Sequence, residues 1–240
     1  MIFLIFLQLF VLQAFGGRPL NTDDADVIGM HQGQIETWIF ADRRSFQHWL
    51  VPTVGINDAL EISASGVHGF TSTDIQGNYS ASGPILQTKI NLRKTKFDLL
   101  PGIGFAAGAV PPTGFGVFKS PIWEYFFYMA ASIYPLGNDR LLLHVNLGRQ
   151  TRKQFTDTPS ALLWGAAIEL LILEHTYAFL EASNGEVYGL APGSVSQAGI
   201  RYEFKPGIQI DGTFGNGLSG EPIQPLWVSL GIKVTSDHLL

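Results

Sequence analysis

The sequence predicts an all-β protein: a transmembrane, antiparallel up-and-down β-barrel of about twelve strands with a polar interior. Apolar and polar residues alternate along most of the chain, the connecting segments alternate between short and long, and an apolar run precedes the first predicted strand. Alternation with a period of two is the pattern of a half-buried strand. Segments of about ten residues are long enough to cross the hydrocarbon core of a bilayer when the strand is tilted.

The predicted strands follow from this alternation and from the Gly, Pro, Asn and Asp residues that bound it. They cover about residues 33–42, 47–56, 60–67, 85–93, 97–109, 122–134, 140–150, 161–172, 174–182, 197–204, 208–215 and 226–235. Residues 161–173 are also compatible with a buried helix. The even number of strands is typical of a single-chain outer-membrane barrel.

The connections between the predicted strands support the same architecture. Those at 57–59, 94–96, 135–139, near Leu173 and at 205–207 are short. Those at 69–84, 110–120, 151–160, 184–196 and 216–225 are longer and rich in Gly and Ser. Short turns at one rim and long loops at the other are typical of outer-membrane barrels, whereas we expect a soluble sandwich or lipocalin to alternate less regularly. Both termini are then expected at the short-turn, periplasmic rim.

One predicted hairpin shows how the two faces of the barrel wall should differ. Residues 197–214 form two predicted strands joined by a loop at 205–207. With that loop, Arg201 lies opposite Asp211, and Tyr202 points to the other face. We therefore expect Arg201 and Asp211 to face the lumen while the apolar side of the hairpin meets lipid.

Charged and polar residues on the less apolar face of the strands define the candidate site. We expect them to form a paired polar network in the lumen, because charges away from bulk water persist only when they are paired. The set comprises Glu36, Glu61, Lys89, Glu124, His144, Glu169, Arg201, Asp211 and Lys233.

Aromatic residues near the predicted strand ends are expected on the outer face, at the two membrane–water interfaces. They are Trp38, Trp49, Trp123, Tyr134, Trp164, Tyr177, Tyr202, Phe204 and Trp227. The alternative is ordinary packing in a core, which alternation alone does not exclude.

The N-terminal apolar run is shorter than the about 20 residues that a membrane-spanning helix needs. It fits a secretory signal with Ala14 and Gly16 at the cleavage site, and the alternative is an N-terminal membrane anchor. The predicted organisation is a signal peptide at 1–16, a periplasmic segment at 17–32, the barrel at 33–236 and a C-terminal tail at 237–240. The acidic run Asp23-Asp24-x-Asp26 is interpreted as a solvated turn, because it lacks the glycine and the distal glutamate of a Ca²⁺ loop.

Composition and motifs exclude several functions. The absence of Cys excludes disulfides and thiolate metal sites, and the net charge of −5 argues against a nucleic-acid partner. The sequence has no G-x-S-x-G nucleophile elbow and no H-E-x-x-H zinc motif, and its six His residues are scattered. It therefore indicates no catalytic residue, no metal site and no cofactor, and we expect a protein that is not an enzyme.

Two stretches resemble a known family. The first is Arg18-Pro19-Leu20 with Thr22-Asp23-Asp24-Ala25, followed by Gly33 and Glu36; the second is the run 52–61, PTVGINDALE. Both are similar to the start of the family assigned to the meta-pathway of phenol degradation, although Asn21 replaces a more usual aliphatic residue. After Glu61 only the strand pattern is similar.

The resemblance implies a bacterial outer-membrane barrel that passes small apolar or aromatic compounds and has outer-membrane lipid as its surroundings. A structural barrel without a transport role is the alternative, and a lipid-modifying outer-membrane enzyme is the third.

Overall fold

The computed structural model describes residues 18–71, 79–152, 160–184, 193–220 and 223–236. Its strands are β1 (Gly33–Asp42), β2 (Ser45–Asn57), β3 (Leu60–Thr71), β4 (Tyr79–Arg93), β5 (Gly102–Val110), β6 (Glu124–Ile133), β7 (Leu141–Arg152), β8 (Ser160–Leu173), β9 (Thr176–Ser183), β10 (Val195–Lys205), β11 (Ile208–Gly217) and β12 (Trp227–Ser236). A short 3₁₀ helix, η1 (Gly116–Phe118), lies in the β5–β6 connection. Among the described residues, no helix is long and apolar enough to cross a membrane.

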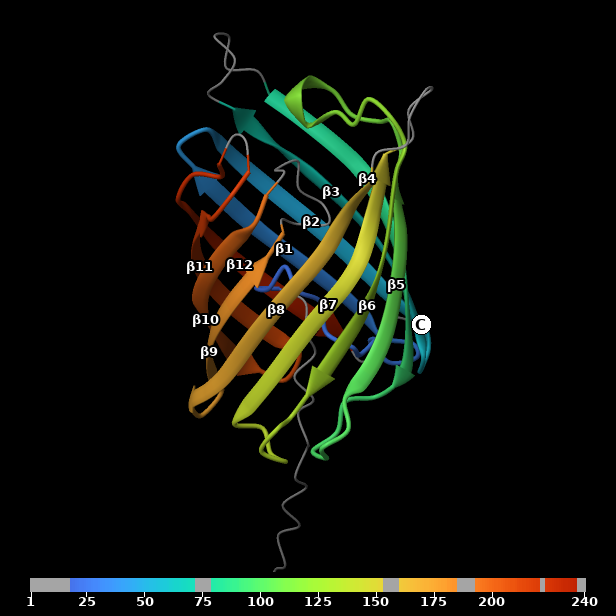
Figure 1. Cartoon of the computed structure of the whole chain (residues 1–240), viewed down its shortest axis with the longest axis vertical. Coiled ribbons are helices and arrows are strands. Elements are labelled where there is room, and N and C mark those ends of the chain that lie inside the picture. Colours follow the sequence, from blue (N-terminus) through green and yellow to red (C-terminus); the bar gives the residue numbers. More distant parts are fainter. Residues whose placement is uncertain (1–17, 72–78, 153–159, 185–192, 221–222, 237–240) are drawn as a thin grey trace, which may run out of the picture.

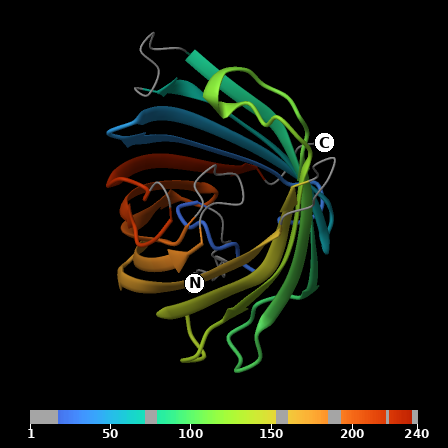
Figure 2. The ribbon, with the colours of Figure 1, turned by 45° about the horizontal axis from the view of Figure 1, so that its top comes forward.

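The strands form one closed antiparallel barrel (Figures 1 and 2). Each strand pairs with its neighbours in sequence, and β12 pairs with β1 to close the ring. The predicted fold, an up-and-down barrel of twelve strands with a polar interior, is therefore confirmed. The run at 161–173 is strand β8 and not a helix.

The connections lie at two rims of the barrel. We call one the turn rim, with connections 58–59, 94–101, 134–140, 174–175 and 206–207. We call the other the loop rim, with connections 43–44 and 111–123 and the described chain ends that flank 72–78, 153–159, 185–192 and 221–222. The loop rim is uppermost in Figure 1.

One turn-rim connection is longer than the sequence predicts. Strand β5 begins at Gly102 and not near residue 97, so the turn expected at 94–96 is a loop at 94–101. The Arg93 side chain holds this loop, because it donates hydrogen bonds to the carbonyl oxygens of Leu100 and Pro101 and to Asp98 Oδ2 at 2.5, 2.8 and 2.7 Å.

The β10–β11 hairpin has the predicted register over most of its length. Arg201 lies opposite Asp211, and both side chains are buried. The register shifts at a bulge between Glu203 and Lys205, so that Lys205 and not Phe204 pairs nearest the turn. Gly207 closes the turn with a φ of 76°, which a residue without Cβ adopts readily.

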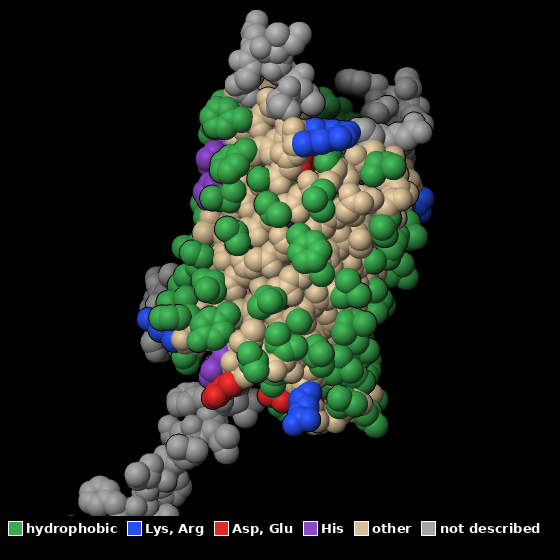
Figure 3. Space-filling model, turned by 90° about the vertical axis from the view of Figure 1, so that its left-hand side faces the viewer, with side chains coloured by type: hydrophobic (Ala, Val, Ile, Leu, Met, Phe, Trp, Pro, Cys, Tyr) green, Lys and Arg blue, Asp and Glu red, His purple; other side chains and the backbone are tan. Residues whose placement is uncertain are grey.

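The outer face of the barrel is apolar. Side chains such as Ile35, Phe127, Leu147 and Leu230 are exposed on alternate positions of their strands, and Figure 3 shows hydrophobic side chains spread over one side of the barrel. Their neighbours in sequence point inward. The wall therefore carries its polar side chains on the inside, the reverse of a soluble barrel.

Four of the nine aromatic residues expected outside are buried instead: Trp38, Trp49, Tyr134 and Trp227. Trp38 is two residues from the buried Glu36 and therefore shares its face, and Trp49 is the cross-strand partner of Trp38. Tyr134 packs against Phe97. Trp123, Tyr202 and Phe204 are exposed as predicted, whereas Trp164 and Tyr177 are partly buried.

Residues 18–28, which we call the lumen segment, run inside the barrel and not outside its rim (Figure 2). The sequence predicts a separate periplasmic segment for these residues and a solvated turn for the acidic run at 23–26. That interpretation of the acidic run is wrong, because Asp24 is buried and bonded to Lys89.

Gly108 on the inner wall makes room for a large side chain. A Cβ added at Gly108 would collide with the Phe126 ring and with Leu86 O, whereas one at Gly212 would meet Leu230 Cδ2 at 3.3 Å. We expect Gly108→Ala to lower the free energy of unfolding by about 1–3 kcal/mol through overpacking, and Gly212→Ala to have a much smaller effect. Urea unfolding of the two variants in lipid vesicles checks this, and equal losses would contradict the packing described.

Candidate functional site

The lumen is divided along the barrel axis into a polar part near the turn rim and an apolar part towards the loop rim. Strand β1 shows the change: Gln34 and Glu36 point inward near the turn rim, and Trp38 and Phe40 follow on the same face. The polar part contains the lumen segment and the predicted charged set except Glu124. The candidate site therefore consists of two chemically different regions of one interior.

The lumen segment is held by side chains of the barrel wall. Its backbone N–H groups need partners because they are out of reach of bulk water. Wall side chains accept those hydrogen bonds: Asn21 N and Thr22 N donate to Glu181, Asp23 N to Asn146 Oδ1, Ala25 N to Ser132 Oγ, and Ile28 N to Glu61 Oε2. When every printed side-chain partner of residues 18–28 is included, the partners lie on nine strands, β1, β3, β4, β6, β7, β9, β10, β11 and β12. The segment therefore crosses the lumen and does not follow one strand.

Lys89 on β4 is the centre of the charge pairing. Its Nζ lies 2.8 Å from Asp23 Oδ1 and 2.8 Å from Asp24 Oδ1, both on the lumen segment. Glu61 Oε1 on the neighbouring strand β3 is 4.0 Å away. Tyr128 donates a 2.7 Å hydrogen bond to Asp23 Oδ2. One buried ammonium group therefore joins the segment to the wall.

Arg18, at the other end of the segment, pairs with Asp211. The distance from Arg18 Nη2 to Asp211 Oδ1 is 2.8 Å, and the same nitrogen donates to Ser229 Oγ at 2.6 Å. The guanidinium carbon lies 4.8 Å from the centre of the Trp38 ring. Arg18 N also donates to Glu36 Oε2 at 3.3 Å. The polar and aromatic parts of the lumen meet at this residue.

Arg201 faces the lumen as predicted, but its ion-pair partner is Glu169 and not the residue opposite it. The Arg201 Nη2–Glu169 Oε2 distance is 2.6 Å, and the guanidinium carbon lies 4.6 Å from the Tyr177 ring centre. Glu169 Oε1 is 3.4 Å from His144 Nε2, and His144 Nδ1 is 2.8 Å from Ser132 Oγ. The strand register therefore predicts the face on which Arg201 lies, but it does not predict that Glu169 is its ion-pair partner.

All nine residues of the predicted lumen set are buried. The structure groups Glu61 with Lys89 and groups His144, Glu169 and Arg201. Glu36 and Lys233 are cross-strand partners. Glu124 lies apart, towards the loop rim, where it accepts hydrogen bonds from Gln150 Nε2 at 2.9 Å and Ser120 Oγ at 3.3 Å.

Sequence reasoning missed Glu181 and the whole contribution of the lumen segment. Glu181 is buried on β9 and accepts hydrogen bonds from Asn21, Thr22 and Gln197. Its alternation with the exposed Leu180 was a signal that could have identified it. The residues of the lumen segment carried no such signal, because they follow no strand pattern.

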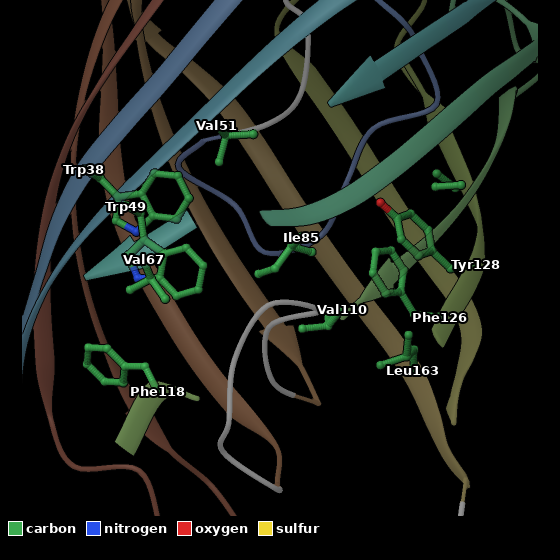
Figure 4. Packing of buried hydrophobic residues seen from close by; sticks show 12 residues of the cluster. Trp38, Trp49, Val51, Val67, Ile85, Val110, Phe118, Phe126, Tyr128 and Leu163 are labelled. Atoms are coloured by element: carbon green, nitrogen blue, oxygen red, sulfur yellow. The ribbon is translucent and has the colours of Figure 1, made fainter. Parts of the chain in front are cut away.

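The apolar part of the lumen forms a cluster of buried side chains (Figure 4). The Trp38 and Trp49 rings stack with centres 5.4 Å apart and planes 3° apart. The Phe126 and Tyr128 rings stack at 6.4 Å on the opposite part of the wall. We call this the apolar cluster, and its members are Trp38, Trp49, Val51, Val67, Ile85, Ala106, Val110, Phe118, Phe126, Tyr128, Ala130 and Leu163.

A small cavity lies where the two regions meet. It measures about 20 Å³ and is lined by Asn21 and Thr22 of the lumen segment together with Tyr128, Asn146 and Leu163 of the wall, among others. A space of this size holds about one water molecule. A larger solute does not fit in this cavity.

Comparison with known proteins supports the fold. No protein-family model and no curated protein matches the chain. An outer membrane channel from Pseudomonas putida F1 matches with a TM-score of 0.65 and 9% identity over 89% of this chain and 98% of that one. KdgM porin in complex with disordered oligogalacturonate matches with a TM-score of 0.57 and 12% identity, over 85% of this chain and 99% of that one. NanC porin matches with a TM-score of 0.53 and 9% identity, over 85% of this chain and 98% of that one. Identities this low show a shared barrel fold.

The pairing at Lys89 predicts a large effect of one substitution. Lys89→Met leaves the carboxylates of Asp23, Asp24 and Glu61 without their cation, and breaking a buried pair from one side costs about 3–5 kcal/mol of unfolding free energy. We also expect the lumen segment to become sensitive to added protease. Urea unfolding and limited proteolysis in lipid vesicles measure the two effects.

The matched control removes the charge of an exposed pair. Asp98 and Arg93 lie at the turn rim with side chains 44% and 31% exposed, and Asp98→Asn keeps the Oδ1 that accepts from Leu100 N, so this variant should lower the free energy of unfolding far less than Lys89→Met. Equal losses in the two variants would contradict the role given to Lys89.

Proposed function

We propose that the chain is an exported barrel of the bacterial outer membrane. Its apolar outer face supports this, because lipid replaces water around such a surface. A closed barrel also pairs every strand with two neighbours, which membrane hydrocarbon requires of the backbone. The solved structures that share its fold include outer-membrane channels and porins. Residues 1–16, the proposed signal, lie outside the described residues.

Within this membrane, the proposed function is that of a passive channel for small apolar or aromatic compounds. The observation that carries the proposal is the apolar cluster, which places stacked Trp rings on the inner wall of a barrel. A channel for hydrophilic solutes gains nothing from burying these rings in its interior, whereas an apolar solute can exchange water for contact with them. The resemblance of residues 18–36 and 52–61 to the phenol-degradation family supports the same class of solute.

Passage through the polar part of the lumen then requires movement of the lumen segment. The segment is anchored by hydrogen bonds and by two groups of ion pairs, at Lys89 and at Arg18, and these are local contacts that can break without loss of the barrel. Strand pairing around the ring does not involve the segment. We therefore propose that a closed state, with residues 18–28 in the lumen, alternates with an open one in which these residues leave it.

The absence of Cys in the chain permits a direct test of this movement. Ala25 N and Ser132 Oγ are 2.9 Å apart, so the two residues adjoin, and the double variant Ala25→Cys/Ser132→Cys can be tested for a disulfide that ties the segment to β6. We expect single-channel openings to disappear when the disulfide forms and to return on reduction. Planar-bilayer recordings before and after reductant measure this.

The two single-cysteine variants are the controls, since neither can form the cross-link. Openings that persist unchanged in the oxidised double variant would show that solutes pass without displacement of the lumen segment.

The solute class has its own test in the apolar cluster. Val51 and Thr53 are both buried and both point inward from β2, but Val51 belongs to the cluster. Val51→Asn places an amide there, and displacing its water costs about 1 kcal/mol or more, so we expect uptake of a radiolabelled aromatic compound by cells to fall by roughly fivefold. Thr53→Asn is the control and should change uptake little. Equal uptake by the parent and by a strain lacking the protein would contradict the transport role.

A further inference from the structure

The outer wall near the loop rim carries two histidines side by side. His48 on β2 and His68 on β3 are directly opposite each other in the strand register. His68 is exposed and His48 is half-buried, and both lie on the outward face among apolar side chains. Neither residue contacts the lumen network, so the proposed channel function gives them no role.

A chain of hydrogen bonds fixes the protons of this pair. Thr37 Oγ1 donates to Trp49 O at 2.9 Å and therefore has only its lone pairs left for His48 Nε2, 2.7 Å away. His48 consequently carries its proton on Nε2, and its Nδ1 presents a lone pair. His68 Nε2, 2.8 Å from that Nδ1, is the donor. The two nearest ring nitrogens thus face one another at one point on the surface.

This geometry is close to that of two ligands on one metal ion. Metal–imidazole bonds of about 2.0–2.1 Å at a right angle place the two nitrogens about 2.8–3.0 Å apart. Tetragonal coordination by nitrogen and oxygen is typical of Cu²⁺ and Ni²⁺, and Cu²⁺ binds most tightly in the divalent series. We propose that His48 Nδ1 and His68 Nε2 form a surface site for a divalent transition-metal ion, with Cu²⁺ as the preferred ion.

Binding requires a small rearrangement that the site permits. His68 Nε2 gives up its proton, and Nδ1 of the same ring takes one up, so the ring stays neutral and both ligating nitrogens present lone pairs. The exposed His68 ring can turn to aim its lone pair at the ion. His48 needs no new proton position, because its Nε2–H already donates to Thr37, the kind of second contact that orients a metal-bound imidazole.

The site has two protein ligands. Among the described residues, no group of three or more His, Cys, Asp or Glu side chains is placed to hold a metal ion. In the proposed site, the ligands beyond these two nitrogens come from the surroundings of the barrel. On one side the site is bordered by Tyr79, whose ring centre is 5.7 Å from that of His68. A bound ion would tie β2 to β3 close to the loop rim.

The experiment is a Cu²⁺ titration of the full chain in detergent, without an affinity tag, followed by electron paramagnetic resonance. We expect one saturable site whose spectrum shows nitrogen coupling, and loss of that site in His48→Ala and in His68→Ala. Thr37→Val should keep the site but weaken it by about 10- to 100-fold, because only the orienting contact is removed.

His175→Ala is the matched control, since His175 is exposed at the turn rim beside Glu174 and should leave the site unchanged. Heat-modifiable migration on gels confirms that each variant is folded. Absence of saturable binding in the parent, or equal binding in the folded His68→Ala variant, would overturn the proposal.

Discussion

The pairing of buried charges inside the barrel is the constraint on which the rest of the structure depends. A barrel wall that turns its apolar side outward must turn its polar side inward, where carboxylates and cations are out of reach of bulk water. Such groups persist only when partners surround them. The wall supplies some of these partners, as in the Glu169–Arg201 pair, and residues 18–28 supply the others through Arg18, Asp23 and Asp24. The lumen segment is therefore part of the folded interior of the barrel.

The division of the lumen follows from the same constraint. Polar residues are concentrated where the lumen segment can satisfy them, and the wall beyond the segment becomes apolar and aromatic. Arg18 lies at the boundary, paired with Asp211 on one side and stacked near Trp38 on the other. The apolar cluster therefore lies towards the loop rim, and the charged layer that the lumen segment completes lies towards the turn rim.

The sequence predicted the fold because period-two alternation encodes both strand positions and faces. It predicted the register of Arg201 and Asp211 from the length of one turn. The spacing along a strand also determines the face of two buried aromatic rings: Trp38 follows Glu36 by two residues, and Trp227 precedes Lys233 by six, so each ring shares the face of a lumen charge. A position near a strand end therefore does not by itself place an aromatic ring at the membrane interface.

Ion-pair partners could not be predicted in the same way. Lys89 meets Asp23 and Asp24 across more than sixty positions of sequence, and Arg18 meets Asp211 across 193. Such contacts depend on the path of an irregular segment through three-dimensional space, and no local pattern in residues 18–28 encodes that path. Turn residues alone also do not determine where strands end. In the loop at 94–101, between β4 and β5, hydrogen bonds from the Arg93 side chain to two carbonyl oxygens hold the chain in place.

Hydrogen exchange of the lumen segment tests the central claim most directly. The backbone N–H groups of Thr22, Asp23, Ala25 and Ile28 donate to side chains of the wall. In the full chain reconstituted into lipid nanodiscs, hydrogen-exchange mass spectrometry should show that these amides exchange far more slowly than those of an exposed peptide. Exchange as rapid as that of a free peptide would show that residues 18–28 do not reside in the lumen, and it would contradict the account.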